Sequence, residues 1–480
     1  MIETEVVVMG GGIIGAFIFD TLTTNGIKTI LIEKGEDVSL GATKANSGII
    51  HAGYDCECKT LKAKYNVIGN KMYNKIAKRL GEKICNCGSL VVAKENELGV
   101  LKELLKRGRT NKVPKLKILK EKKLKKLEKN LSDEIKYGLY AKTAKIISPY
   151  HFCISLCEEA ILNGGNLLLN CEIKKIEQID KHFILSSNDK KIKTKYLINA
   201  CANSVNEINS LLNEHLLDIS FTKGEYILLD HSEQGLVSRP IFPLPSEKGK
   251  GILACPTVNG NIFFGPTAIN VDNYDTSVNY SSINIIKTQV SNMIKNINFK
   301  KTIKLYAGVR VKQGSDFYIK FSDQNPNYLV ISGICSPGLT SAPAIAKDVL
   351  SMLEQRGLKK HKIKLKKRKP YTNTITMSPS KLNKLIKKDK NYGEIVCRCE
   401  NITKGEILEV LNGPIKPLTT DGIKRRLRTT MGRCQGSFCY PKLLEIMANC
   451  YKTDMSNIIS RGKESLVVGN IKKGGIYEQD

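Results

Sequence analysis

The order of strand, glycine turn and helix in the first 33 residues is the feature that most constrains the fold. Residues 5–9 form a short apolar run of strand type, and Gly-Gly-Gly-Ile-Ile-Gly follows at once over residues 10–15. A helical stretch then extends to about Asn25, and a second apolar run, residues 27–32, ends at Glu33. This order is typical of the first half of a dinucleotide-binding α/β domain.

The three glycines and the glutamate of this pattern each contribute to nucleotide binding. Gly10 permits the tight turn, Gly12 lets the backbone approach a pyrophosphate, and Gly15 lets the helix pack closely on the strand. Glu33 lies about twenty residues beyond the glycines, where a carboxylate can accept hydrogen bonds from a ribose diol. The sequence therefore predicts a Rossmann-like domain with a bound dinucleotide.

Two later segments predict that this domain is discontinuous. Residues 196–200 and 328–333 read as buried strands of the same sheet. Between them, residues 221–264 offer alternating apolar runs interrupted by glycine and proline, which indicates an antiparallel sheet. Residues 90–93 are a candidate further strand of that second sheet.

The loop Gly41-Ala-Thr-Lys-Ala-Asn-Ser-Gly-Ile-Ile-His-Ala-Gly53 carries a family resemblance. It resembles the flavin loop of the D-amino-acid oxidase-like superfamily, most of all the branch of glycerol-3-phosphate oxidases and dehydrogenases and L-2-hydroxyglutarate oxidases. One departure lies at Asn199-Ala-Cys-Ala202, where the family usually has a final glycine. Further matches are Thr60-Leu-Lys-Ala-Lys64, Gly88-Ser-Leu-Val-Val92, Lys223-Gly-Glu-Tyr226, Gly249-Lys-Gly251, Gly265-Pro-Thr267, Ala307-Gly-Val-Arg310 and Ser336-Pro-Gly-Leu-Thr-Ser-Ala-Pro343.

The resemblance implies an FAD-dependent oxidoreductase over residues 1–355. We expect an α/β fold: a discontinuous Rossmann-like FAD-binding domain and an α+β substrate domain with an antiparallel sheet above the flavin ring. The FAD-binding parts should be about 1–80, 145–215 and 300–355, and the substrate parts about 81–144 and 216–299. A basic linker (356–391), a small helical iron-sulfur domain (392–450) and a tail (451–480) should follow.

Four cysteines near the C-terminus predict a metal centre. Cys397 and Cys399 form one close pair, and Cys434 and Cys439 form the other. Flexible glycine segments beside them can turn backbone N–H groups toward sulfur, as iron-sulfur ligation requires. Zinc is the rival metal, but the C-x-C pair is tight for a tetrahedral ion. A third interpretation is that the four thiols bind no common metal.

The sequence around these cysteines is similar to that of the bacterioferritin-associated ferredoxin-like domain, a small helical module with a [2Fe–2S] cluster. The matching segments are Ile395-Val-Cys-Arg-Cys-Glu400, Thr403-Lys-Gly-Glu406, Thr420-Asp-Gly-Ile-Lys-Arg-Arg-Leu427 and Met431-Gly-Arg-Cys434. The resemblance implies a [2Fe–2S] cofactor held by the four cysteines.

The remaining cysteines and the N-terminus indicate a reducing compartment. The chain has 15 cysteines, several of them in apolar contexts, which fits reduced thiols better than a disulfide framework. Cys56-x-Cys58 and Cys85-x-Cys87 could be redox-active or hold a metal, but free buried cysteines are common. No apolar run reaches membrane-spanning length, and Glu3 and Glu5 stand where a signal peptide would be basic. We expect a cytoplasmic protein.

The formal charge of +30 invites a nucleic-acid hypothesis, which we rank last. Lysine runs such as residues 115–129, where leucines recur at helical spacing, are usually solvated helical surfaces. Residues 359–369 lie in the expected linker, where an acidic partner or an anionic membrane surface could bind peripherally. An ordinary solvated linker explains them equally well.

The expected chemistry needs a base for a substrate hydroxyl and cations for its anionic end. His51, inside the matched loop, is the candidate base, because an ordinary imidazole titrates near pH ~6.5. Arg310 could grip a phosphate or carboxylate with two parallel hydrogen bonds, and Lys250, between two glycines, could add a point charge. Ser47 and Ser336 are lesser hydrogen-bond donors to the substrate.

The remaining predicted contacts are to the cofactor. Residues 342–353 read as a helix, and the residues just before it would place its N-terminus toward the electron-rich side of the reduced flavin. The predicted FAD contacts are Gly10, Gly12, Gly15, Glu33, Thr43, Ala45, Asn46, Ser47, Gly338, Leu339 and Thr340.

The resemblance and these residues together predict a dehydrogenase that oxidises sn-glycerol 3-phosphate to dihydroxyacetone phosphate. The electrons would leave through the [2Fe–2S] cluster to a partner subunit, a carrier or a quinone. L-2-Hydroxyglutarate, a dicarboxylate, is the competing substrate. A different class of function is an electron-transfer subunit whose alcohol site has decayed.

Overall fold

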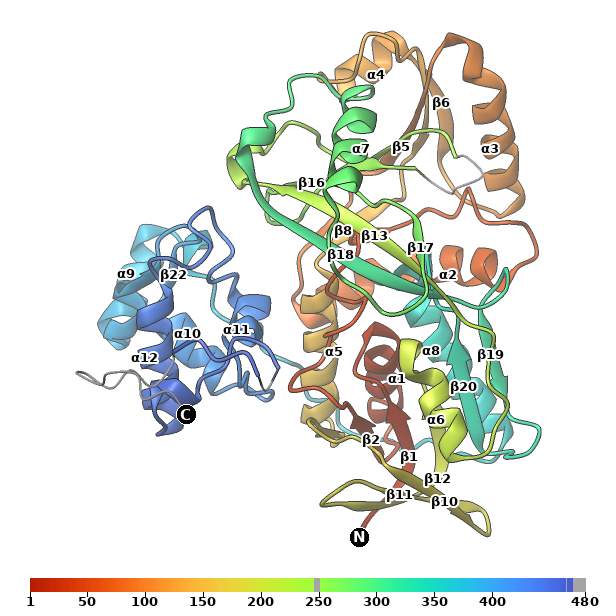
Figure 1. Ribbon diagram of the computed structural model, residues 1–480, viewed down its shortest axis with the longest axis vertical. Coiled ribbons are helices and arrows are strands. Elements are labelled where there is room, and N and C mark those ends of the chain that lie inside the picture. Colours follow the sequence, from red (N-terminus) through yellow and green to blue (C-terminus); the bar gives the residue numbers. More distant parts are fainter. Residues whose placement is uncertain (246–250, 463, 469–480) are drawn as a thin grey trace, which may run out of the picture. The chain divides into compact units, whose positions relative to one another are not determined.

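The computed structural model describes residues 1–245, 251–462 and 464–468 (Figure 1). The chain divides into two compact units. The first comprises Met1–Lys34 and Val38–Arg368, and the second comprises Gly35–Asp37 and Lys369–Asp480. Three residues from near the N-terminus therefore belong to the unit formed by the C-terminal part.

The first sheet of the first unit has eight strands built around β12 (Lys191–Asn199). β1 (Ile2–Met9) runs parallel to β12 on one side and to β2 (Thr29–Ile32) on the other. β20 (Tyr328–Ser332) runs parallel to the last residues of β12. The predicted discontinuity is thus confirmed, and the carboxyl ends of these four strands meet at one edge. The other strands are β9 (Asn166–Leu168), β10 (Lys175–Ile179), β11 (His182–Ser186) and β19 (Tyr318–Phe321).

Helices cover this sheet. The last four residues of β1 are all buried, as expected for a parallel strand enclosed on both faces. α1 (Ile13–Thr23) packs against α5 (Pro149–Leu162) and α8 (Gly338–Gln355), and the three lie side by side (Figure 1). α2 (Leu61–Leu80) packs on α8, and α6 (Val205–Leu211) follows β12.

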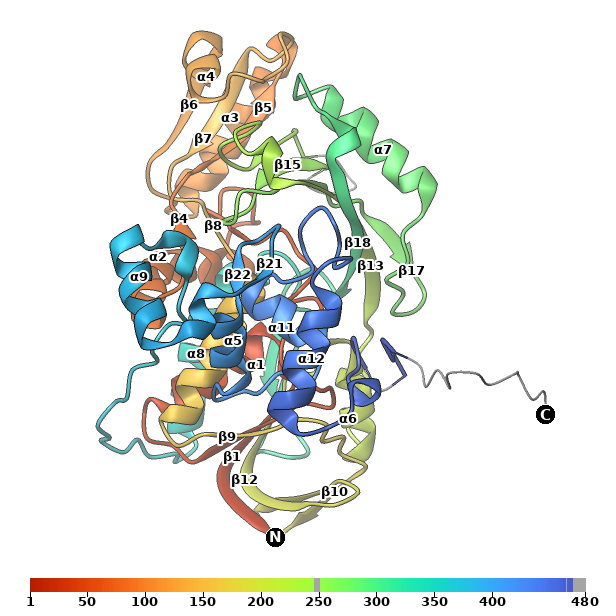
Figure 2. The same cartoon turned by 90° about the vertical axis from the view of Figure 1, so that its left-hand side faces the viewer.

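The second sheet has nine strands and is antiparallel except for the pair β14 and β5. Its longest paired strands, β13 and β18, lie at one end of the strand order, away from β5, β6 and β7 (Figure 2). The predicted antiparallel sheet is confirmed, and the segment of residues 90–93 joins it within β5. The strands are β5 (Ser89–Ala93), β6 (Leu116–Lys120), β7 (Tyr137–Ala141), β13 (Ser220–Leu229), β14 (Ile241–Phe242), β15 (Leu253–Pro256), β16 (Ile262–Gly265), β17 (Ile269–Val271) and β18 (Thr302–Lys312).

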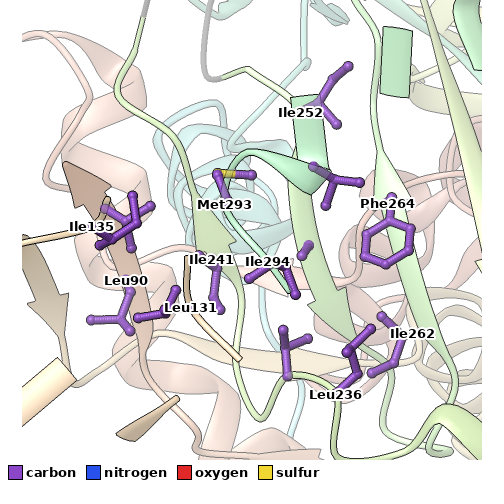
Figure 3. Close-up of a cluster of buried hydrophobic side chains, with 14 of the residues drawn as sticks. Leu90, Leu131, Ile135, Leu236, Ile241, Ile252, Ile262, Phe264, Met293 and Ile294 are labelled. Carbon is purple, nitrogen blue, oxygen red and sulfur yellow. The ribbon is translucent and has the colours of Figure 1, made fainter. Parts of the chain in front are cut away.

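A buried apolar cluster fixes one face of this sheet. Leu90 of β5, Ile241 of β14 and Phe264 of β16 gather with Met293 and Ile294, which follow α7 (Tyr280–Ser291) (Figure 3). α3 (Leu98–Thr110) packs near β6 and β7. Burial of this apolar area stabilises the sheet by about 25 cal/mol per Å² removed from water.

The lysine-rich stretch 115–129 differs from the predicted helical surface. Its first part, Leu116–Lys120, is strand β6, and only Glu121–Leu127 forms a helix, α4. The sequence Leu-Lys-Ile-Leu-Lys fits either period over so few residues, and pairing with β7 decides for the strand. The lysines are exposed at positions 117 and 120, as a solvated face requires.

A small third sheet lies between the two parts of the first unit. Its central strand β8 (Lys145–Ile147) pairs antiparallel with β3 (Ile49–Ile50) and β4 (Ile84–Cys85). β3 belongs to the loop that resembles a flavin loop, so this sheet ties that loop to the start of the second sheet.

The second unit is mostly helical, as predicted. Thr403 accepts a hydrogen bond from the Glu406 N–H and the Glu406 carboxylate accepts one from the Thr403 N–H, so a capping box begins α10. The helices pack on a core that includes Ile407, Ile423 and Leu443. The elements are α9 (Pro379–Lys388), β21 (Ile395–Cys397), β22 (Ile402–Thr403), α10 (Lys404–Leu411), α11 (Thr420–Leu427) and α12 (Tyr440–Tyr451).

The stretch expected as a basic linker, residues 356–391, contains α9, and Arg368 within it is buried against Glu158 of the first unit. Short 3₁₀ turns among the described residues occupy Glu95–Glu97, Ala202–Ser204, His231–Glu233, Phe299–Lys301, Thr374–Thr376, Lys390–Gly393 and Met455–Asn457. The expected tail, 451–480, is described only as far as residue 468, apart from residue 463.

Candidate functional site

The glycine turn between β1 and α1 has the geometry of a dinucleotide site. Gly10 has φ +104°, and a Cβ there would lie 2.6 Å from the Ala200 carbonyl oxygen. A Cβ at Gly15 would lie 2.0 Å from the Gly10 carbonyl oxygen. At Gly12 the nearest atom would be Thr43 Oγ1 at 3.5 Å, an ordinary contact. Two glycines are therefore demanded by close packing, and the third leaves the backbone open to a ligand.

Glu33 lies at the same edge of the sheet, directly after β2. Its Oε2 accepts a hydrogen bond from the Gly11 N–H at 2.8 Å. Thr43 Oγ1 accepts one from the Ile13 N–H, in the first turn of α1, at 2.9 Å. The carboxylate and the loop residue thus flank the helix N-terminus, where backbone N–H groups favour phosphate.

The loop 41–53 is folded by its own asparagine. The Asn46 amide donates to the carbonyl oxygens of Ala42 and Thr43, and its Oδ1 accepts from the Gly48 N–H at 2.8 Å. A Cβ at Gly308 of β18 would lie 2.1 Å from the Ala45 carbonyl oxygen. The second sheet therefore rests on this loop at Ala45.

The first turn of α8 meets the far end of the loop. α8 begins at Gly338, four residues before the predicted start, so Leu339 and Thr340 are helical. Thr340 Oγ1 accepts a hydrogen bond from the His51 N–H at 2.9 Å. The structure thus brings the predicted cofactor residues of α8 beside His51.

Arg310 lies on the face of β18 that is turned toward the loop. Side chains alternate along a strand, so Tyr306, Gly308 and Arg310 share one face. The Arg310 Nη2 donates to the Thr267 carbonyl oxygen at 3.2 Å. Guanidinium has five donors, so the half-buried Arg310 has capacity for an anionic ligand as well.

Tyr226 was missed by the sequence analysis. Its ring stacks on that of Tyr306, with centroids 4.6 Å apart and planes at 6°, and its hydroxyl lies 3.4 Å from Ser47 Oγ. Burial raises the pKa of Tyr226, so the hydroxyl stays a hydrogen-bond donor. The signal was available: Tyr226 lies in a matched segment and shares a strand face with Gly224, which pairs with Gly308.

Phe242 was also missed. Its ring centroid lies 5.9 Å from that of His51, with the planes tilted by 44°. Phe242 is buried in β14, whereas the His51 side chain is partly exposed. The aromatic wall restricts the positions open to the imidazole.

Ser336 and Lys250 are the other two predicted substrate residues. Ser336 is partly buried in the loop between β20 and α8. Lys250 lies outside the described residues, so its predicted role stays a prediction. His51, Ser47 and Arg310 are the predicted residues that the structure gathers around the loop.

Ala202 occupies the position where the resembled family usually has glycine. Its φ of +50° lies in the left-handed region, which favours glycine. The departure seen in the sequence therefore falls on a position with a real backbone requirement.

The four C-terminal cysteines form two interacting pairs of thiols in the second unit. Cys397 contacts Cys439, and Cys399 contacts Cys434. Over the described part of the chain, no three Cys, His, Asp or Glu side chains are arranged in the compact shell of a single ion. Four cysteines are the number of ligands that a [2Fe–2S] cluster takes.

Backbone N–H groups surround these sulfurs. Hydrogen bonding from the Cys439 thiol lowers the pKa of Cys397 to about 6, helped by the N–H groups of Glu400 and Thr430. Against the effect of burial, the N–H groups of Gly436 and Phe438 lower the pKa of Cys434. The pKa values of Cys399 and Cys439 are raised instead, that of Cys439 chiefly by its hydrogen bond to Cys397. Four sulfur atoms with backbone N–H donors beside them are the donor set that a [2Fe–2S] cluster requires.

The cysteines of the other two C-x-C pairs form no disulfide. Cys56 is buried, whereas Cys58 and Cys85 are exposed. Burial, with the neighbouring Cys85 as a second cause, raises the pKa of Cys87 to about 12. We assign them no function.

Residues 5–352 match the family model of FAD dependent oxidoreductases. The chain belongs to this family. Residues 395–449 of this FAD-dependent oxidoreductase match the model of BFD-like [2Fe-2S] binding domains. The predicted cofactors, FAD and a [2Fe–2S] cluster, are therefore confirmed.

Sequence and structure comparisons give relatives with related activities. The flavoprotein is 38% identical over 461 residues to a glycerol 3-phosphate dehydrogenase of Caloramator mitchellensis, covering 95% of this chain and 96% of the relative. It is 27% identical over 287 residues to the human mitochondrial L-2-hydroxyglutarate dehydrogenase, covering 55% of this chain and 61% of the relative. The structure of the L-alpha-glycerophosphate oxidase of Mycoplasma pneumoniae with FAD bound superposes with a TM-score of 0.70 at 27% identity, covering 77% of this chain and 97% of that one.

None of the helices formed by the described residues is both long and apolar enough to cross a bilayer.

Proposed function

We propose that this flavoprotein oxidises sn-glycerol 3-phosphate to dihydroxyacetone phosphate and passes the electrons through its cluster to a one-electron acceptor. One observation carries the proposal: similarity to a glycerol 3-phosphate dehydrogenase extends over 95% of the chain, cluster module included. The gathering of Arg310, Ser47 and His51 around one loop supports it, because a phosphate needs a cation and the hydroxyl needs a base.

The residues divide the work as follows. Bound FAD supplies the two-electron acceptor for the substrate hydride. His51 takes the hydroxyl proton as the C–H bond breaks, and Arg310 binds the phosphate through parallel N–H donors. Lys250 adds a second cation, and Ser47, Tyr226 and Ser336 orient the polyol. Gly10, Gly12, Gly15, Glu33, Thr43, Ala45, Asn46, Gly338, Leu339 and Thr340 would hold FAD.

The test is an anaerobic titration of the purified, FAD-loaded protein with glycerol 3-phosphate. We expect the flavin to bleach with this substrate, whereas L-2-hydroxyglutarate at equal concentration leaves it oxidised. The His51→Ala variant should keep FAD but lose the bleaching. Bleaching by L-2-hydroxyglutarate alone would overturn the substrate, and no bleaching by either would favour an electron-transfer subunit.

We also propose that the acceptor is a partner subunit, a carrier or a quinone, and that the enzyme works in the cytoplasm. The exposed basic stretch from Lys359 to Lys367 supports peripheral contact with an anionic membrane surface. Cosedimentation with vesicles that contain anionic lipid, lost at high salt, tests this contact. Equal binding to neutral vesicles would refute it.

A further inference from the structure

One face of α2 is polar although it is buried. Asn66, Gly69, Asn70 and Tyr73 follow the spacing i, i+3, i+4 and i+7, so they lie on one side of the helix. Asn66 is 0% and Asn70 5% exposed. A Cβ at Gly69 would lie 2.0 Å from the Thr340 carbonyl oxygen, so this face is pressed against the start of α8.

Both asparagines bind the backbone of His51. The Nδ2 atoms of Asn66 and Asn70 donate to the His51 carbonyl oxygen at 3.0 and 2.9 Å. On its other side, the His51 N–H donates to Thr340 Oγ1. The backbone of the proposed base is therefore held from both directions by side chains of two helices.

Lys145 decides how the Asn70 amide is oriented. Its Nζ donates to Asn70 Oδ1 at 2.7 Å, to the Asn70 carbonyl oxygen at 3.1 Å and to the Thr143 carbonyl oxygen at 3.0 Å. An ammonium donates three hydrogen bonds and accepts none, so Oδ1 must face Lys145. The Asn70 Nδ2 must then face the carbonyl oxygens of His51 and Thr143, to which it donates.

The arrangement is costly, which argues for a function. Lys145 is 5% exposed, and no carboxylate among the described residues forms an ion pair with it. Burial of an ammonium among neutral oxygens costs free energy that an apolar residue would avoid. Such local costs are found chiefly where a site needs them.

We propose that Lys145 and Asn70 are positioning residues for the proposed reaction: Lys145 orients the Asn70 amide, and Asn70 holds the peptide of His51 so that the imidazole points at the substrate. This inference rests on the proposed function, because it gives His51 its role as base. Neither Lys145 nor Asn70 needs to touch the substrate.

A purely structural role makes a different prediction from a positioning role. If the network only tied α2 to β8, its loss would change stability and FAD content. A positioning role changes the rate constant of flavin reduction while substrate affinity stays the same, because a base displaced by about 1 Å can cost about 100-fold in rate.

The first experiment is anaerobic stopped-flow reduction of the full-length holoenzyme by glycerol 3-phosphate. In Asn70→Ala and Lys145→Met, the reduction rate constant should fall by about 10- to 100-fold, with FAD content and substrate Kd near those of the wild type. Asn74→Ala and Lys142→Met are matched controls, because both residues are exposed near the same elements. Rate constants equal to those of the controls would refute the proposal.

The second experiment uses pH. Burial lowers the pKa of Lys145 to about 8. The titratable groups nearest in register are His51, after its partner strand β3, and Cys85 of β4. Loss of the ammonium proton removes one donor and turns a lone pair toward an oxygen, so reduction should slow above about pH 8 in the wild type.

The Lys145→Arg variant stays charged in this range and should lose that alkaline fall. The same fall in both proteins would contradict the proposal. If Lys145→Met does not retain FAD, the arginine variant and Asn70→Ala decide.

A third measurement separates this inference from the proposed function. In hydrogen exchange, the segment 47–54 should exchange faster in Asn70→Ala than in Asn74→Ala, with or without substrate. If wild-type flavin were not reduced by glycerol 3-phosphate, the proposed function would fail while this readout still stood. Unchanged exchange with a normal wild-type reaction would refute the positioning role alone.

Discussion

Arg310 shows how a single side chain acquires a role from its strand. β18 pairs with β13 so that Arg310 lies opposite Thr222, on the face where Gly308 touches the flavin loop. The register therefore places Arg310 on the strand face that is turned toward the loop, where we propose that it binds the anionic end of the substrate.

We predict that Arg310→Met raises the Kd for glycerol 3-phosphate by about 10- to 150-fold, because a charged hydrogen-bonding group contributes about 1.5–3 kcal/mol. Arg310→Lys should recover part of this, since it keeps the charge but loses the planar fork. Titration of the flavin absorbance measures the Kd. Lys312→Met, exposed on the same strand, is the control. An unchanged Kd in Arg310→Met would place the phosphate elsewhere.

Ala202 gives a second prediction at the residue scale. The left-handed backbone of Ala202 costs about 1–2 kcal/mol, because the residue has a Cβ. Glycine would remove this strain, but it loses more conformational entropy on folding, which offsets about 0.5–1 kcal/mol of the gain. We expect Ala202→Gly to raise the unfolding free energy by up to about 1 kcal/mol, measured by denaturant titration. Lower stability would show that the Ala202 methyl contributes packing that outweighs the strain.

At the scale of elements, the last turn of α11 and the segment Gly35–Asp37 form one charged cluster in the second unit. Asp37 Oδ2 accepts hydrogen bonds from Arg425 Nη2 at 2.8 Å and Arg426 Nη1 at 2.7 Å, and all three side chains are buried. Although burial opposes it, Arg426 and then Arg425 lower the pKa of Asp37.

A depressed carboxyl pKa stabilises the fold above the ordinary value of about 4, and the stabilisation is lost as pH falls through the native pKa. We predict that Asp37→Asn costs about 3–5 kcal/mol at neutral pH, because it leaves buried guanidinium charge uncompensated. Its stability should also depend less on acid pH than that of the wild type. Glu445→Gln, which removes an exposed pair with Lys442, should cost at most about 1 kcal/mol. Equal losses in urea titrations of both variants would contradict the argument.

The elements also show where sequence patterns end. The capping box at Thr403 was predictable because its reciprocal hydrogen bonds need only residues three apart. The stretch 116–120 was not, because five residues fit two periods and only the partner strand β7 decides. The sequence predicted that α8 begins at residue 342, whereas it begins at Gly338. Contacts with α2 and with the loop 41–53, which come from distant parts of the chain, meet these first helical residues.

At the scale of the whole molecule, two redox modules share one chain. The FAD-dependent part accepts two electrons from its substrate, whereas a [2Fe–2S] cluster carries one at a time. Flavin reduction by the substrate and electron exit through the cluster should therefore be separable by variants of the second unit.

We predict that Cys399→Ser loses the cluster but still bleaches its flavin with glycerol 3-phosphate. The electron-paramagnetic signal of a reduced cluster, present in the substrate-treated wild type, should be missing from this variant. Cys450→Ser, a free cysteine in α12, should behave as the wild type. A wild-type cluster that stays oxidised after the flavin has bleached would show that electrons leave by another route.

The sequence by itself determined the modules, their order and their cofactors. The glycine turn, the carboxylate after the second strand and the paired cysteines are each recognised from residues close together in the chain. The tertiary structure decided the site. Only folding brings together the segments whose side chains form the site. Examples are the contact of Tyr226 with Ser47 and the hydrogen bonds of Asn70 to His51 and of Lys145 to Asn70. Contacts between such distant segments depend on strand register and helix packing, and these leave no local pattern in a single chain.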